Sequence, residues 1–187
     1  DENNFPGFYT VYRTIRSYPR KIGGNLLGDV GEINERQLKM KRYADYRSGD
    51  YVGQSGVEKA YEEELRGKKG VKIMEKDTHG VVKGSYMDGM FDSLPEPGSY
   101  IVTTIDARLQ AFTEELMRGK VGAAVAIEPS TGEILMMVSS PTFDPDEMVG
   151  RHRGNNYMKM LYNKRQPMFN RAVKAKYPPG STFKLVQ

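Results

Sequence analysis

The end of this sequence contains the pattern that most constrains the local fold. Pro178, Pro179 and Gly180 cannot continue a regular helix or strand, so the chain must turn there. Ser181 follows at once, and serine is favoured at helix starts because its side chain serves unpaired backbone amides. Lys184 comes one helical turn later, on the same face. The pattern therefore predicts a turn that places a serine hydroxyl beside a lysine amine.

A serine and a lysine in this arrangement are the parts of an acylating nucleophile, in which the amine takes the hydroxyl proton. A lysine serves as a base near neutral pH only where burial or nearby cations lower its pKa. The Ser181 backbone amide, at the positive end of the predicted helix, can stabilise an acyl oxyanion. The motif alone does not establish catalysis, because Ser-x-x-Lys occurs by chance about once in a chain of ordinary composition. A capping serine followed by a solvated lysine is the ordinary alternative.

The residues around this motif resemble one enzyme family along almost the whole chain. The stretches that carry the likeness are residues 53–61 (GQSGVEKAY), 103–110 (TTIDARLQ), 122–135 (GAAVAIEPSTGEIL), 139–145 (SSPTFDP), 167–172 (PMFNRA) and 177–184 (YPPGSTFK). In this order they resemble the pedestal signature, the opening of the transpeptidase domain, its first hairpin and the active-site entry of class B penicillin-binding proteins. Residues 5–7 and 26–31 also fit the pedestal. The basic connection and the Tyr-Pro-Pro-Gly-Ser stretch are more similar to the cell-elongation branch than to the septal branch.

This resemblance implies an α+β fold in two domains. Residues 1–97 would form a mixed pedestal, or dimerisation-like, domain that is incomplete at its N-terminus. Residues 98–187 would form the incomplete start of a transpeptidase α/β domain. Ser181 is implied as the nucleophile of peptidoglycan D,D-transpeptidation, with its backbone amide in the oxyanion hole, and Lys184 as the general base. We expect neither a cofactor nor a metal.

The resemblance also implies partners and a location. The ligands would be peptidoglycan stem peptides and β-lactams, and the pedestal would contact membrane glycosyltransferase and shape-determining proteins. The protein would work at the outer, periplasmic face of the bacterial cytoplasmic membrane, with a single-pass anchor absent from this chain. The complete family site also needs Ser-x-Asn and Lys-Thr-Gly motifs, and neither follows Ser181 in the sequence. We therefore expect these 187 residues to be inactive on their own.

Two other classes of function remain open at this stage. A class D β-lactamase or penicillin sensor also uses a Ser-Thr-Phe-Lys nucleophile, although the pedestal-like first hundred residues argue against a simple lactamase. A non-catalytic scaffold that binds partners through the pedestal is the second alternative. Release of hydrolysed penicillin would favour the first, and partner binding that survives Ser181→Ala would favour the second.

Positive charge gathers towards the C-terminus. After Glu147 the chain has no acidic residue, whereas lysines and arginines recur at positions 151, 153, 159, 164, 165, 171, 174, 176 and 184. Interleaved tyrosines resemble a nucleic-acid surface, but no nucleic-acid-binding motif accompanies them, so we expect no nucleic acid. Two explanations remain open: acidic residues outside this sequence balance the charge, or the charge attracts the carboxylates of stem peptides.

Local patterns predict the elements of the first domain. Residues 9–18 and 26–33 are candidate strands. Ser55 and Glu58 have the spacing of a capping box, followed by a helix through Leu65 whose acidic run at residues 62–64 we expect to be solvated. A hairpin is predicted from residues 71–77 and 81–86, with His79 in its turn.

The second half has clearer signals. Residues 94–98 form a proline-rich linker, followed by a predicted strand at residues 100–104. Asp106 is a candidate cap for a helix that runs to about Arg118, with Leu109, Phe112 and Leu116 on one face. Residues 123–127 and 134–138 flank a Pro-Ser-Thr-Gly turn and predict an antiparallel hairpin.

Overall fold

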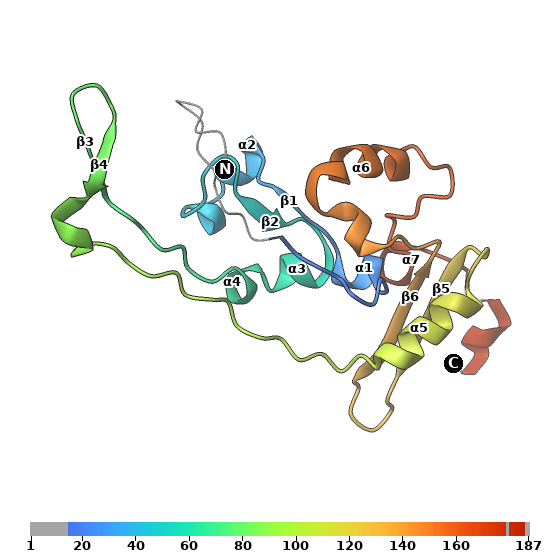
Figure 1. Cartoon of the computed structure of the whole chain (residues 1–187). Coiled ribbons are helices and arrows are strands. Elements are labelled where there is room, and N and C mark those ends of the chain that lie inside the picture. The colour runs from blue at the N-terminus through green and yellow to red at the C-terminus, as the bar shows by residue number, and fades with distance from the viewer. Residues whose placement is uncertain (1–14, 179, 186–187) are drawn as a thin grey trace.

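The computed structural model describes residues 15–178 and 180–185. Figure 1 shows an elongated molecule, with the β3–β4 hairpin at one end and the β5–β6 hairpin, covered by α5, at the other. None of the helices in the described part of the chain has the length and the apolar run that a membrane crossing requires. The mixed α+β class predicted from the sequence is confirmed.

The strands of the described residues form antiparallel pairs. The pairs are β1 (Val30–Glu32) with β2 (Tyr51–Gly53), β3 (Met74–Lys76) with β4 (Val82–Ser85), and β5 (Gly122–Ile127) with β6 (Ile134–Ser140). Beside β1 and β2 lies a small core of Ile33, Tyr43 and Val52. Their burial removes apolar surface from water, and this is the main local source of stability.

Most helices are a single turn or little more. The α-helices are α1 (Gly24–Leu27), α2 (Glu35–Leu38), α3 (Gly56–Ala60), α4 (Glu62–Leu65), α5 (Ala107–Leu116), α6 (Arg153–Leu161) and α7 (Arg171–Lys174). The 3-10 helices are η1 (Lys41–Tyr43), η2 (Tyr86–Gly89), η3 (Pro145–Met148), η4 (Gly150–His152) and η5 (Gly180–Leu185). Helices this short depend on tertiary contacts, since an isolated helix of this length is not stable in water.

Helices α1 and α3 meet through backbone contact at two glycines. Gly28 has φ 88° and Gly56 has φ 59°, both in the left-handed region. A Cβ on Gly56 would lie 2.5 Å from the Leu26 carbonyl oxygen, and a Cβ on Gly28 would lie 2.0 Å from the Ser55 carbonyl oxygen. Neither position therefore accepts a side chain without moving the backbone.

Gly56→Ala is expected to lower the free energy of unfolding by about 2–3 kcal/mol, because strain at positive φ adds to the backbone clash. Gly49→Ala is the matched control, since Gly49 has φ 91° and a methyl group on its Cα would meet no atom within 4 Å. It should lose only the strain component, about 1 kcal/mol. Urea unfolding of both variants measures the difference, and equal losses would contradict the contact argument.

The predicted capping box at Ser55 and Glu58 is wrong. Ser55 does occupy the N-cap of α3, but no side-chain cap forms there. Its hydroxyl instead donates to Asp29 Oδ1 at 2.6 Å, and the Glu58 carboxylate accepts from the Tyr18 hydroxyl at 3.0 Å. Tertiary partners have displaced the local cap.

The helix predicted through Leu65 is present but interrupted at Tyr61, between α3 and α4. The expectation of a solvated acidic run is wrong for Glu62, which is 6% exposed. Its carboxylate accepts from the Gly53 amide at 2.6 Å and from the Tyr46 hydroxyl. Glu62 therefore joins α4 to β2.

Of the two candidate N-terminal strands, residues 9–18 lie mostly outside the described residues, and residues 15–18 form no strand. Residues 26–33 divide between α1 and β1. The β3–β4 hairpin is confirmed, with the Asp77 carboxylate accepting from the His79 and Val81 amides to close its turn. This is the local side-chain turn chemistry that aspartate favours.

In the second half, the β5–β6 hairpin and the Asp106-capped α5 are confirmed. The strand predicted at residues 100–104 is wrong: Tyr100 is 100% exposed, and no described strand pairs with this segment. The apolar face predicted for α5 is largely solvent-facing, with Phe112 and Leu116 exposed. The residues of α5 that are buried are Gln110 and Thr113. The Gln110 side chain accepts from the amide of Met137 in β6 and donates to its carbonyl, as the backbone of a neighbouring strand would.

Candidate active site

Ser181 and Lys184 lie on the 3-10 helix η5, at the same end of the molecule as β5 and β6 (Figure 1). Residues three apart in a 3-10 helix are eclipsed, so the two side chains leave the same face. Both residues are exposed, and within the described residues neither side chain has a hydrogen bond or ion pair. Gly180 has φ 60° and is the first residue of η5, whereas Pro179 of the predicted turn lies outside the described residues.

The element that precedes this pair is α7, which packs against both β5 and β6. A short connection, residues 175–178, leads from α7 towards η5. The described residues from 176 onwards form no hydrogen bond or ion pair with other parts of the described chain. Helix α7 is therefore the last anchored element before Ser181.

Arginines of the basic stretch are committed to tertiary contacts. Arg153 bonds the Asp29 carboxylate, Arg165 bonds the Gly119 carbonyl at 2.6 Å, and Arg171 is buried among backbone carbonyls. Arg153 and Arg165 therefore join segments that are far apart in the chain, whereas Arg171 binds residues of its own loop.

The Asp29–Arg153 ion pair joins the N-terminal half to α6. The Asp29 side chain is 4% exposed, and its oxygens lie 2.6 Å from both an Arg153 nitrogen and the Ser55 hydroxyl. Arg153 also donates to the Val30 carbonyl at 2.9 Å, and its guanidinium lies over the Tyr157 ring. Sequence reasoning missed this pair, because 124 positions separate its members and no local pattern links them.

A cavity of about 730 Å³ adjoins this ion pair. Its walls come from both halves of the chain and include Asn25, Asp29, Arg153 and Asn170. Ser181 is not among the described residues that line it, so the cavity is distinct from the predicted nucleophile. The Asn170 Oδ1 atom is buried and has no hydrogen-bond partner among the described residues.

Two tyrosines in the N-terminal half have raised pKa values. Burial, reinforced by the hydrogen bond to Glu62, raises the pKa of Tyr46 to about 12. Burial, reinforced by the nearby Glu58 carboxylate, also raises the pKa of Tyr18 above its ordinary value. Both hydroxyls remain protonated donors at neutral pH, so these contacts are structural anchors and not acid–base catalysts.

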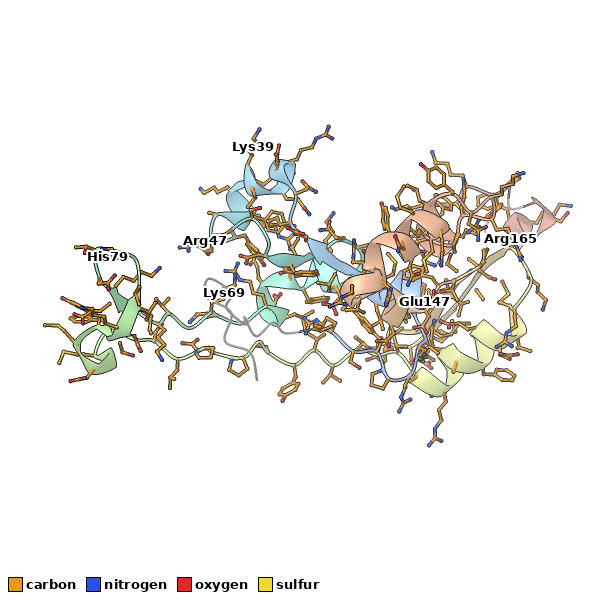
Figure 2. All side chains as sticks on the ribbon, turned by 45° about the horizontal axis from the view of Figure 1, so that its top comes forward. Lys39, Arg47, Lys69, His79, Glu147 and Arg165 are labelled. Carbon is orange, nitrogen blue, oxygen red and sulfur yellow. The ribbon has the colours of Figure 1, made fainter. Side chains whose placement is uncertain are left out.

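Other candidate chemistry is weak in the described part of the chain. Across residues 15–178 and 180–185, no group of three or more His, Cys, Asp or Glu side chains could hold a metal ion. His79 and His152 are both exposed. Figure 2 shows His79 at the tip of the β3–β4 hairpin, at the opposite end of the molecule from Arg165.

Comparison with known families matches almost the whole chain. A model described as the penicillin-binding protein dimerisation domain matches residues 1–103. A model described as the penicillin-binding protein transpeptidase domain matches residues 122–187. The order of the two matches is the order inferred from the motifs. Because the first match covers a dimerisation domain, the class D β-lactamase alternative is not favoured.

Curated relatives support the same relationship. The chain is 38% identical to the peptidoglycan D,D-transpeptidase MrdA of Acinetobacter baumannii over 181 residues, which cover 96% of this chain and 26% of that protein. It is 30% identical to MrdA of Escherichia coli K12 over 189 residues, covering 98% of this chain and 29% of that protein. The chain thus spans about a quarter of the length of the curated relatives it matches.

Solved structures agree in fold. The structure of a complex between PBP2 and MreC from Helicobacter pylori matches with a TM-score of 0.74 and 30% identity, over 91% of this chain and 31% of that chain. Pseudomonas aeruginosa PBP2 in complex with WCK 5153 matches with a TM-score of 0.68 and 36% identity, over 91% of this chain and 33% of that chain.

Proposed function

This chain belongs to the penicillin-binding protein family, and we propose that the protein is a serine D,D-transpeptidase that crosslinks peptidoglycan. The observation that carries the proposal is the Ser181-x-x-Lys184 pair on one face of η5, inside the segment that matches the transpeptidase model. The curated relatives named peptidoglycan D,D-transpeptidase support the same reaction class.

In the proposed reaction, Ser181 Oγ attacks the carbonyl carbon of the penultimate D-alanine of a stem peptide. Lys184 accepts the hydroxyl proton, and the Ser181 backbone amide donates to the developing oxyanion. Collapse of the tetrahedral intermediate breaks the peptide bond, and Lys184 returns the proton to the departing D-alanine amine. The amine of a second stem peptide then attacks the acyl ester and loses a proton to Lys184, which passes it to the leaving Ser181 oxygen; this forms the crosslink and regenerates the serine. A β-lactam would acylate the same oxygen and be released slowly.

The location and macromolecular partners belong to the same proposal. The protein would act at the outer face of the cytoplasmic membrane, where its stem-peptide substrates are. The Helicobacter pylori neighbour was solved in complex with MreC, and another neighbour is described as a peptidoglycan synthase complex. We place shape-determining and glycosyltransferase partners on the N-terminal half. The β3–β4 end supports this placement, because Met87, Met90, Phe91 and Leu94 are all exposed there.

Covalent labelling tests the proposal. The full-length gene product is incubated with a fluorescent penicillin, and the adduct is located by peptide mass spectrometry. We expect one stable adduct, on the peptide that carries Ser181. An adduct on another residue, or no adduct, would reject the assignment. Rapid release of hydrolysed penicillin would favour a β-lactamase-type reaction instead.

A further inference from the structure

A buried arginine at the start of α7 gathers the loop that precedes it. Arg171 is 8% exposed, and its guanidinium donates to the carbonyl oxygens of Arg165 at 2.7 Å, Gln166 at 3.0 Å and Phe169 at 3.3 Å. No carboxylate pairs with it among the described residues. A buried cation is costly unless its donors are satisfied, and the planar guanidinium fork suits several carbonyls at once. Arg171 therefore holds one loop conformation.

The conformation that Arg171 holds is not one the loop would adopt freely. Gln166 has φ 50°, in the left-handed region that a residue with a side chain rarely occupies. Such backbone persists only where surrounding contacts enforce it. Here the contacts are the hydrogen bond from Arg171 to the Gln166 carbonyl and the Phe169 ring beneath the guanidinium.

The same loop is fixed to the sheet by Ser139 of β6. Ser139 is 3% exposed, and its hydroxyl accepts from the Arg171 amide at 2.9 Å while donating to the Phe169 carbonyl at 3.1 Å. The bond from the Arg171 amide is buried, so loss of the hydroxyl would leave that amide without its partner. The start of α7 is thus tied to a particular point on β6.

The N-terminal half holds the loop from the other side. The Asn25 side-chain amide in α1 donates to the Pro167 carbonyl at 2.9 Å, and the Asn170 side-chain amide donates to the Asn25 carbonyl at 3.1 Å. Asn25, Ser139, Asn170 and Arg171 together form what we call the loop clasp. It fixes the last anchored element before the Ser181 segment.

We propose that Asn25 and Arg171 are positioning residues for acylation of Ser181, an inference that rests on the proposed transpeptidase function. The clasp sets the place and direction from which the chain leaves α7 for Ser181. Because catalytic rates fall steeply when reacting groups shift by about 1 Å, loosening the clasp should slow the chemical step more than it weakens ligand binding. Through Asn25, the pedestal would take a direct part in positioning Ser181.

Kinetics of penicillin acylation in the full-length gene product test this inference. The concentration dependence of the labelling rate separates the acylation rate constant from the apparent dissociation constant. Asn25→Asp and Arg171→Lys should each lower the acylation rate constant about ten-fold and change the dissociation constant by less than about two-fold. Asn25→Asp removes the donor to Pro167, and Arg171→Lys replaces a planar fork by a single point charge.

Gln37→Glu is the matched control for Asn25→Asp. Gln37 is a buried pedestal amide that donates to Gln54 and has no contact with the clasp. It should lose thermal stability like Asn25→Asp, while its acylation rate constant stays within about two-fold of wild type. Equal slowing in the control and in Asn25→Asp, or no slowing in either clasp variant, would overturn the inference.

Hydrogen exchange provides a readout that does not depend on activity. Amides of residues 163–175 should exchange faster in Asn25→Asp and Arg171→Lys than in wild type or Gln37→Glu, because the clasp no longer closes the loop. Unchanged exchange there would also reject the inference. If wild type fails to label at Ser181 while the exchange difference is present, the proposed reaction is wrong but the clasp stands as a structural device.

Discussion

Replacing Lys184 by glutamine is expected to slow the acylation of Ser181 by penicillin about 10²- to 10⁴-fold, the usual contribution of a general base. Glutamine keeps most of the side-chain length but cannot accept the hydroxyl proton. Residues three apart in a 3-10 helix are eclipsed, so Lys184 lies on the same face of η5 as Ser181. No other described residue of η5 follows Ser181 by three positions. Time courses of fluorescent labelling in the full-length gene product measure the effect.

Lys176→Gln is the control for the loss of one positive charge. Lys176 is exposed, precedes η5 and has no predicted part in the chemistry. Its substitution should leave the labelling rate within about two-fold of wild type, since a single solvated charge is largely screened. A normal rate in Lys184→Gln would remove Lys184 from the role of base while leaving Ser181 as the nucleophile.

The elements that could be predicted from the sequence are those whose determinants lie close together in the chain. Asp106 caps α5 by accepting from the amides of Arg108 and Leu109, and Asp77 closes the β3–β4 turn in the same manner. These interactions need only the backbone of the next few residues, so a local pattern is enough to identify them.

Local reasoning fails where a distant partner competes for the same side chain. Ser55 and Glu58 have the spacing of a capping box, but a buried carboxylate and a tyrosine hydroxyl bind them more favourably. The acidic run suggests that Glu62 is solvated, yet its carboxylate accepts a buried hydrogen bond from a backbone amide of β2. The members of these pairs are 26, 40 and 9 positions apart, farther than a capping or turn pattern reaches, so the tertiary contact overrides the local preference.

The candidate site shows the same division. The spacing of Ser181 and Lys184 is readable from the sequence, whereas their support is not. Ser139 and Arg171 are 32 positions apart, and Asn25 and Pro167 are 142 positions apart. The motif therefore predicts the chemistry, and the folded chain is needed to show which contacts hold the segment that precedes it.

Arg153→Leu is expected to cause the largest loss of stability, about 3–5 kcal/mol in the free energy of unfolding. The substitution leaves the Asp29 carboxylate buried, with the Ser55 hydroxyl as its remaining side-chain partner among the described residues. It also frees the Val30 carbonyl, which Arg153 caps in wild type. Urea unfolding followed by circular dichroism measures the loss, with Arg151→Leu, an exposed neighbour, as the control.

A second substitution separates the buried charge from the lost packing. In Asp29→Asn/Arg153→Leu the neutral amide no longer needs a cation, so the double variant should recover at least about 1 kcal/mol relative to Arg153→Leu. If Arg153 mattered only through its contact with the Tyr157 ring, the double variant would instead be less stable than the single one. The sign of this difference decides whether the two halves of the chain are joined here by charge or by packing.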